Sequence, residues 1–241
     1  MTFRSLITVI VVASLFSHTL PRVFADGAGA GGEGRVLRHA VFFKFKEGVG
    51  DDEVVAIVKA FGELPSQIEA IEAFEWGENI SKSGMDGGYT HCFLLTFADE
   101  AGRAEYLPHP AHKAFVKLLG GKIETPFVLD YWGKPGDFGE DALRHAVFFR
   151  WKLELTEAEV RKMDAEIRAF PESISQIQTF EAGVNVSVEP FDAGFTHCYL
   201  VTFADEAALA EYIEHETHMA LVGKLEATVK DVRVFDWLPG K

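Results

Sequence analysis

The 241-residue sequence predicts an α+β protein made of two copies of one β-α-β-β-α-β unit, and three observations support this. First, LRHAVFF at 37–43 recurs at 143–149, and GYTHCFLLTFADEA at 88–101 recurs as GFTHCYLVTFADEA at 194–207. Second, both pairs are separated by the same 106 positions (143 against 37, 194 against 88), which leaves no net insertion. Third, strand-like and helix-like segments alternate in the same order in both copies. The two copies should therefore share one fold.

The order of elements follows from the periodicity of apolar residues along each copy. In the first copy, LRHAVFFKF and YTHCFLLTF are apolar strands, and DDEVVAIVKAF between them has helical spacing. A further strand is expected near 71–80, a helix after the N-cap Asp99, and a last strand near 126–132. In the second copy the last strand is expected over 232–238, and Asp205 takes the place of Asp99.

The first helix is most clearly predicted in the second copy. Val160, Met163 and Ile167 fall at helical spacing, so they form one apolar stripe. Thr156 and Glu159 form a capping box, in which each side chain satisfies a backbone N–H at the start of the helix.

This order of elements is that of a ferredoxin-like unit, an antiparallel four-stranded sheet with two helices on one face. Its first and third strands are neighbours at the centre of the sheet. The strands are apolar on both faces, because Phe42 and Phe43 point opposite ways, as do Phe93 and Leu94. The face without helices needs a cover, and we expect the same face of the other copy to provide it. The result would be an intramolecular dimeric α/β barrel of eight strands with its helices outside.

The N-terminus has the pattern of an export signal. Arg4 precedes the apolar run 6–16, and Val23-Phe24-Ala25 places small residues before a cleavage site. The run is too short to span a bilayer, which needs about 20 apolar residues. The alternative is an uncleaved N-terminal anchor. We therefore predict an exported protein, periplasmic or secreted, with a signal peptide over 1–25, a flexible leader over 26–35, repeat 1 over 36–132, a linker over 133–141 and repeat 2 over 142–238.

Charge and cysteine content narrow the classes of partner. The formal net charge is −14, and such a surface repels phosphate backbones and anionic lipid. We expect no nucleic-acid partner, and no membrane partner once the signal is removed. Cys92 and Cys198 occupy matching strand positions and are interpreted as small core residues. A disulfide between them is the alternative that an exported protein would allow.

The histidines follow the repeat. Of nine His, His18 lies in the predicted signal, and the other eight form four pairs at the same 106-residue separation. By strand parity, His39 and His91 lie on the bulkier apolar face, which should be the face under the helices. The segment Tyr-x-x-His-x-x-His follows the third strand, and Pro108 and Pro110 should prevent a regular helix there in repeat 1. The pairs, joined by Tyr106 and Tyr212, are His39/His145, His91/His197, His109/His215 and His112/His218.

We expect two strand histidines, the tyrosine and the last histidine to converge in one helix-side pocket in each repeat. The alternative is that each strand His is a hydrogen-bonded core residue and each Tyr only anchors a turn. Convergence of imidazoles and a phenol would be typical of an acid/base site.

Three motifs together, RHAVFFKFK, GYTHCFLLTF and EYLPHPAH, resemble the stress-responsive dimeric α/β-barrel (Dabb) family. The resemblance covers 36–132 and 142–238 and implies the same eight-stranded pairing. It also implies a polyketide-cyclase-like ring closure without a cofactor. By motif, the functional residues would be Tyr106, His112, His39 and His91 in repeat 1, and Tyr212, His218, His145 and His197 in repeat 2. Repeat 2 departs from the motif, since His-Glu-Thr-His replaces His-Pro-Ala-His.

Three hypotheses on function come from the sequence. In the first, His112 and His218 are bases, Tyr106 and Tyr212 are hydrogen-bond donors, and the strand histidines orient them. No cofactor is needed, and the reaction would be a cyclisation, isomerisation or lyase step. In the second, the barrel binds a small hydrophobic molecule or protects against stress without turnover. In the third, the histidines bind a metal or haem, although neither His-x₃-His nor Cys-x₂-Cys occurs.

Overall fold

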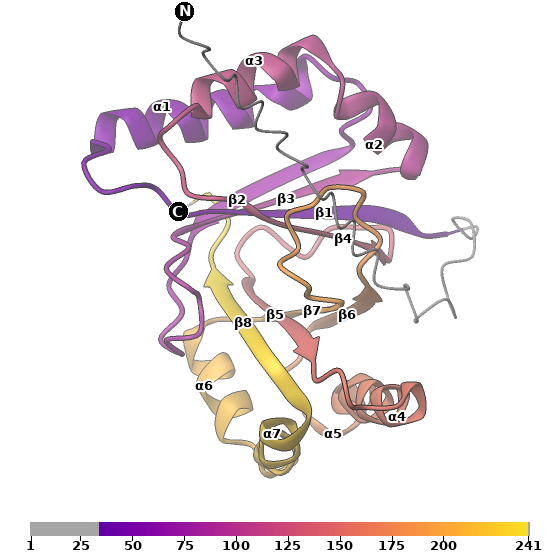
Figure 1. Ribbon diagram of the computed structural model, residues 1–241. Coiled ribbons are helices and arrows are strands. Elements are labelled where there is room, and N and C mark those ends of the chain that lie inside the picture. The colour runs from indigo at the N-terminus through magenta and orange to yellow at the C-terminus, as the bar shows by residue number, and fades with distance from the viewer. Residues whose placement is uncertain (1–33, 241) are drawn as a thin grey trace, which may run out of the picture.

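The computed structural model describes residues 34–240 and shows two four-stranded antiparallel sheets, one from each repeat, packed face to face (Figure 1). The predicted signal peptide, 1–25, and the leader up to residue 33 lie outside the described residues. The strand orders are β2-β3-β1-β4 and β6-β7-β5-β8, so the first and third strands of each repeat are central neighbours, as predicted.

The element order of the two repeats is the predicted one, with each predicted second helix divided in two. Repeat 1 contains β1 (Val36–Phe43), α1 (Asp51–Gly62), the short 3-10 helix η1 (Leu64–Ser66), β2 (Ala73–Glu78), β3 (His91–Phe97), α2 (Glu100–Tyr106), α3 (Pro110–Leu119) and β4 (Phe127–Gly133). Repeat 2 contains β5 (Leu143–Trp151), α4 (Glu157–Arg168), α5 (Phe170–Ser173), β6 (Thr179–Val184), β7 (His197–Phe203), α6 (Glu206–Glu214), α7 (Glu216–Thr228) and β8 (Val229–Trp237).

The predicted helix caps are present. The Asp99 carboxylate accepts hydrogen bonds from the backbone N–H of Ala101 and Gly102 at the start of α2. Asp205 accepts the backbone N–H of Ala208 at 2.8 Å at the start of α6. Thr156 and Glu159 form the predicted capping box at the start of α4.

The expectation that Pro108 and Pro110 prevent a helix was wrong. Pro110 is the first residue of α3, a position where the N–H that proline lacks has no partner within the helix. His109 caps this helix, because its Nδ1 accepts the backbone N–H of Ala111 at 3.2 Å. His215 caps α7 in the same way, so this pair of histidines has a structural role.

The core has three layers, which confirms that each sheet is apolar on both faces. One face of each sheet packs under its own helices. The other faces pack against each other, and the ring of Phe42 in β1 stacks on Phe235 in β8 with centroids 4.0 Å apart. Cys92 and Cys198 lie buried in this middle layer as free thiols, as predicted.

The two sheets meet at two seams, where β4 lies beside β6 and β2 beside β8. Glycine allows this close approach, since a Cβ on Gly183 would lie 2.6 Å from the Cβ of Tyr131. The chain segments after β2 and β6 cross to the other repeat: the N–H of Ile80 donates to the carbonyl of Asp236 at 2.7 Å, and that of Val186 to Asp130 at 2.8 Å. Each repeat thereby extends a loop over the helix side of the other.

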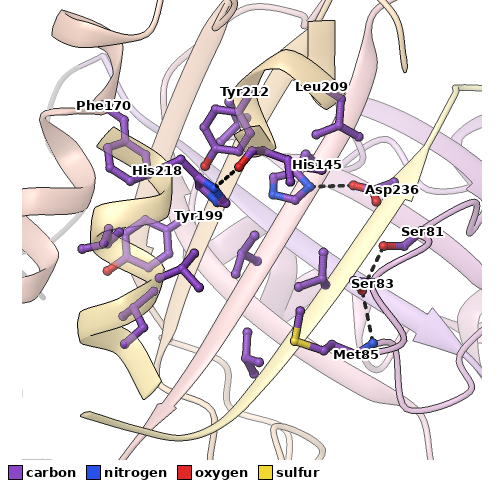
Figure 2. Close-up of a pocket in the computed structure, with 18 of the residues that line it drawn as sticks. Ser81, Ser83, Met85, His145, Phe170, Tyr199, Leu209, Tyr212, His218 and Asp236 are labelled. Atoms are coloured by element: carbon purple, nitrogen blue, oxygen red, sulfur yellow. Dashed lines mark hydrogen bonds and ion pairs between the residues drawn. The ribbon is translucent and has the colours of Figure 1, made fainter. Parts of the chain in front are cut away.

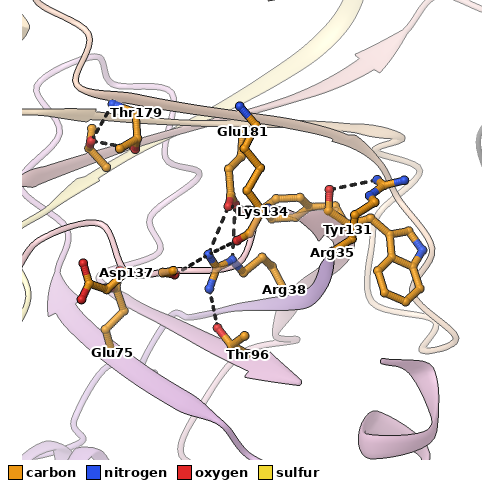
Figure 3. Close-up of polar contacts among 12 residues, drawn as sticks. Arg35, Arg38, Glu75, Thr96, Tyr131, Lys134, Asp137, Thr179 and Glu181 are labelled. Carbon is orange, nitrogen blue, oxygen red and sulfur yellow. Dashed lines mark hydrogen bonds and ion pairs between the residues drawn. The ribbon is translucent and has the colours of Figure 1, made fainter. Parts of the chain in front are cut away.

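Two reciprocal ion pairs hold the repeats together in the middle layer. Arg38 of β1 pairs with Glu181 of β6 at 3.1 Å, and Arg144 of β5 pairs with Glu75 of β2 at 2.7 Å. The linker contributes Phe138, whose ring lies 4.5 Å from the guanidinium carbon of Arg38 and 5.4 Å from that of Arg144. Figure 3 shows the Arg38 half of this arrangement. Within the described part of the chain, no helix is long and apolar enough to cross a membrane.

Candidate functional site

Repeat 2 contains a cavity of about 690 Å³ between its sheet and its helices α6 and α7. Its polar lining includes His145 from β5, Asp236 from β8, Tyr212 from α6 and His218 from α7. The charged side chains of Lys82, Glu206 and Glu226 also line it. Figure 2 shows His145 between Asp236 on one side and Tyr212 and His218 on the other. Most of the remaining wall is apolar, so the cavity suits a hydrophobic molecule with a polar end.

His145 and Asp236 form a hydrogen-bonded pair. They are direct partners in the β5–β8 ladder, and Nδ1 of His145 lies 2.6 Å from a carboxylate oxygen of Asp236. A carboxylate only accepts, so Nδ1 carries the hydrogen, and in the neutral tautomer that this fixes Nε2 is the acceptor. Neither Asp236 nor its repeat 1 equivalent, Asp130, was among the predicted site residues. The available signal was an acidic residue between two large apolar residues in the last strand of both repeats.

His218 is held by the backbone of its own helix pair. Its Nδ1 lies 2.9 Å from the carbonyl oxygen of Ile213, so Nδ1–H is the donor and Nε2 keeps its lone pair. Burial lowers the pKa of His218, the hydrogen bond to Ile213 opposes this, and His145 and His215 lower it further. The net pKa is below the usual value of 6.5, so His218 is neutral at pH 7.

Tyr212 lies between the two histidines. Its ring centroid is 4.6 Å from that of His218 and 5.7 Å from that of His145. Burial, and then the charge of Asp236, raise the pKa of the Tyr212 hydroxyl. The phenol therefore keeps its proton at neutral pH and can donate a hydrogen bond.

The remaining wall of the cavity comes from repeat 1. The loop between β2 and β3 crosses the seam and contributes Ile80, Ser81, Ser83 and Met85. Ser83 Oγ accepts hydrogen bonds from the backbone N–H of Met85 and from the hydroxyl of Ser81, both at 3.1 Å (Figure 2). The site is therefore built by both repeats.

Repeat 1 has the same four groups in the same arrangement. His39 Nδ1 lies 2.6 Å from Asp130, and the Tyr106 ring lies 5.7 Å from His39 and 4.2 Å from His112. His112 Nδ1 donates to the carbonyl of Leu107 at 2.9 Å. Three of the four predicted residues in each repeat are therefore brought together, and the aspartate is added.

Charge distinguishes the two sites. In repeat 1, Arg103 donates to Asp130 at 2.5 Å, and a Glu189 oxygen from the loop of repeat 2 lies 3.9 Å from His39 Nε2. Repeat 2 has Leu209 and Ser83 at the equivalent positions, 106 residues away. Repeat 1 thus holds a buried cluster of ions around its histidine, whereas in repeat 2 the Asp236 carboxylate is the charged group paired with His145.

The ion cluster shifts the titration of its members. Burial lowers the pKa of His39, but Asp130 and Glu189 outweigh burial, and the net pKa is raised. Burial raises the pKa of Asp130, but His39 and Arg103 outweigh it and hold the pKa below the usual value. Burial raises the pKa of Glu189, which His39 only partly offsets. His39 is therefore favoured in its charged form, which is unsuited to a base.

Aromatic side chains also fill the helix side of repeat 1. The ring of Phe61 lies 4.4 Å from Phe115 and 4.7 Å from Phe93, measured between centroids. Repeat 2 has Ile167, Leu221 and Tyr199 at the equivalent positions. Val186 and Phe191, from the loop of repeat 2, pack onto the same core of repeat 1.

The predicted convergence is wrong for His91 and His197. His91 is the ladder partner of Phe43, four residues along the strand from His39, which corresponds to about 13 Å. His197 instead accepts the indole N–H of Trp151 at 2.9 Å. Burial lowers the pKa of His197 to about 4, so it is a neutral core residue. Strand parity predicted the correct face of the sheet for His91 and His197, but it did not give their position along the strand.

No group of three or more His, Cys, Asp or Glu that could hold a metal ion occurs among residues 34–240. The polar groups of the two sites are instead paired or arranged around Tyr106 and Tyr212.

Comparisons with known proteins agree with this architecture. The Arabidopsis thaliana stress-response A/B barrel domain-containing protein HS1 is 35% identical over 95 residues, 39% of this chain and 87% of that protein. Olivetolic acid cyclase of Cannabis sativa is 26% identical over 95 residues, 39% of this chain and 94% of the cyclase. A crystal structure from Fusobacterium nucleatum covers 86% of this chain and 93% of its own, with 10% identity and a TM-score of 0.57, which shows a shared fold alone.

Each relative in sequence thus corresponds to a single repeat, whereas the structural match extends over both. The model of the family described as Stress responsive A/B Barrel Domain matches twice, at residues 37–132 and 143–239. These two segments are the two units that pack sheet to sheet, and together they make up most of the chain. The protein belongs to the stress-responsive A/B barrel domain family and carries two copies of the domain in tandem.

Proposed function

We propose that the cavity of repeat 2 binds a small hydrophobic carbonyl compound and moves a proton at the carbon next to the carbonyl. The reaction would be of the cyclase, isomerase or lyase type and would need no cofactor. The observation that carries the proposal is the convergence of His218, Tyr212 and the His145–Asp236 pair on one apolar cavity of about 690 Å³.

His218 is the proposed base. Its Nε2 lone pair takes the proton from carbon, and the electron pair of that C–H bond moves onto the carbonyl oxygen as an enolate. Tyr212 donates a hydrogen bond to this oxygen, where negative charge develops. His145 has its Nδ1–H held by Asp236 and its Nε2 free to accept, so it is the proposed acceptor of the O–H when this oxygen is protonated to the enol. The enolate carbon then takes back a proton or attacks a second carbonyl, which closes a ring.

The comparisons support this proposal without deciding it. Olivetolic acid cyclase is named for a ring closure, and it is similar to this chain over one domain. The tyrosine and histidine of the Tyr-x-x-His-x-x-His segment are kept in both repeats. In repeat 2 they line an open cavity, whereas in repeat 1 they lie beside a buried ion cluster.

The test is exchange of deuterium from solvent into methyl heptyl ketone, followed by NMR. This ketone fits an apolar cavity and exchanges slowly without a catalyst, so the natural substrate is not required. The wild-type protein should accelerate exchange at the carbons next to the carbonyl. His218→Ala should lose roughly 10²–10⁴-fold in rate, the usual contribution of one positioned base. His112→Ala is the matched control and should keep the wild-type rate.

Line broadening of the ketone in the same samples reports binding. Exchange that is equal in wild type and His218→Ala, or that is lost equally in His112→Ala, would contradict the proposal. Binding of the ketone without any exchange would favour the alternative, a ligand-binding or stress-protective barrel without turnover.

We also propose that the protein is exported, since Val23-Phe24-Ala25 follows a short apolar run. N-terminal sequencing of the protein from its native source should give a mature chain that begins near Asp26. Retention of Met1, or recovery from the cytoplasm, would count against export.

A further inference from the structure

The entrance to the repeat 2 cavity is unusually apolar for a protein surface. Ile80 and Met85 from the loop of repeat 1, and Ile213 and Met219 from repeat 2, are between 37% and 55% exposed, and all four line the cavity. Isolated exposed apolar residues are ordinary, but four around one opening mark a contact surface. Methionine is flexible and adapts its shape to what it contacts. The entrance is therefore suited to the apolar body of a bound molecule.

The other repeat shows what the same loop does when it closes a site. The residues equivalent to Ile80 and Met85 are Val186 and Phe191, and both pack onto the core of repeat 1. The loop backbones are anchored alike: the carbonyl of Phe191 accepts the N–H of Val128 at 3.1 Å, and that of Met85 accepts the N–H of Val234 at 3.3 Å. The loops therefore contribute to the difference between a closed and an open site through their side chains rather than their backbone.

Ser83 is the second difference in this loop. Its equivalent is Glu189, which brings a carboxylate to 3.9 Å from His39 Nε2 in repeat 1. Ser83 brings no charge to His145 and occupies much less space. Its Oγ already accepts two hydrogen bonds, so its own O–H can donate to a polar atom of a bound molecule. The loop therefore brings no carboxylate to His145, and the charge that it does bring to the cavity, on Lys82, is paired with Glu206 at 3.0 Å.

We propose that the repeat 1 loop, residues 79–90, selects the ligand of the repeat 2 site, with Met85 as its specificity-determining residue. The ligand is an uncharged carbonyl compound whose apolar body extends from His145 and His218 out to Met85. This inference rests on the proposed function but concerns selection rather than chemistry. It makes repeat 1 a necessary part of the repeat 2 site.

The test is Met85→Phe, which gives the open loop the residue that its counterpart carries. The KM and kcat of exchange are measured for methyl heptyl ketone and for acetone. The long ketone should lose about tenfold or more in kcat/KM through KM, a usual effect of steric misfit in an apolar pocket. Acetone is too short to reach the entrance, so its kcat/KM should stay within about twofold. Phe191→Met, the reciprocal change in the other loop, should alter neither ketone.

A loss that is equal for both ketones, or no loss for either, would overturn the proposal. Line broadening of the ketone measures binding without exchange, so it distinguishes failure of this proposal from failure of the proposed chemistry. If wild type binds the long ketone without exchange and Met85→Phe weakens that binding about tenfold, selection by the loop stands although catalysis fails. If wild type neither binds nor exchanges the ketone, both proposals fall. Circular dichroism confirms that each variant is folded.

Discussion

Glu181→Ala tests whether the two repeats are held together as the structure describes. The Glu181 carboxylate is buried and accepts four hydrogen bonds: two from Arg38, at 3.1 and 3.3 Å, one from the Tyr131 hydroxyl at 2.9 Å and one from the backbone N–H of Lys134 at 2.9 Å (Figure 3). The substitution removes all four. It leaves the Arg38 guanidinium buried between the sheets, where it keeps bonds to Thr96 and to two linker carbonyls but no carboxylate.

The size of the effect follows from burial. Removing one partner of a buried ion pair costs about 3–5 kcal/mol, because the other charge is left without compensation. For a domain pair of this size, that loss lowers the melting temperature by roughly 6–20 °C. Glu75→Ala is the matched control, because Glu75 holds Arg144 by two hydrogen bonds and its side chain is 19% exposed. Water can reach that site, so we expect a loss of about 1–3 kcal/mol.

The measurement is urea denaturation of wild type and both variants, followed by far-ultraviolet circular dichroism and by tryptophan fluorescence. Trp237, one of four tryptophans, lies in the middle layer between the sheets, so part of the fluorescence signal reports separation of the repeats. Both probes should give one transition in wild type. An equal or smaller loss for Glu181→Ala than for Glu75→Ala would refute the reasoning, since the fully buried partner would then contribute no more than the exposed one.

Two further predictions concern buried titratable groups. The pKa of His39 is raised in the folded protein, so its contribution to the free energy of unfolding is fully present below pH 6.5 and is lost as pH rises through the folded pKa. Urea midpoints should fall over that range in wild type, and a fall of the same size in His39→Gln would contradict the assignment. Burial raises the pKa of the Cys92 and Cys198 thiols, so iodoacetamide should label them only in concentrated urea. Labelling of the native protein, measured by mass spectrometry, would show that the middle layer opens.

The fold could be predicted from the sequence because repetition and strand parity act together. A constant separation of 106 positions identifies two repeats of one fold, and this inference needs no knowledge of how they pack. Apolar residues on both faces of one strand, such as Phe42 and Phe43, then required a cover on each side. Only one available surface, the sheet of the other repeat, has the matching pattern.

The site was predicted less completely, for identifiable reasons. Parity gives the face of a strand but not the position along it, so it could not separate His91 from His39. Asp130 reaches His39 through ladder register, which depends on which strands pair. Pro110 was read as a helix breaker, although the structure places it where helices accept proline. The crossing loops could not be predicted, since nothing local in 79–90 indicates contact with the other repeat.

Fusion of two domains into one chain has a physical consequence that a pair of identical chains cannot have. In a symmetric pair, every loop residue acts at both sites at once. Here the loop of repeat 2 can carry Glu189 and Phe191, which seal and charge one site, while the loop of repeat 1 carries Ser83 and Met85, which leave the other open.

The sealed site also has an energetic role. The open apolar cavity of repeat 2 lacks the packing contacts that would stabilise that repeat. In repeat 1, aromatic contacts such as Phe61 on Phe115 fill the equivalent space. Because the repeats share the middle layer and the Arg38–Glu181 pair, stability gained in repeat 1 supports repeat 2. Divergence of the two sites is therefore a route by which one repeat can keep an open cavity under its helices while the whole chain stays folded.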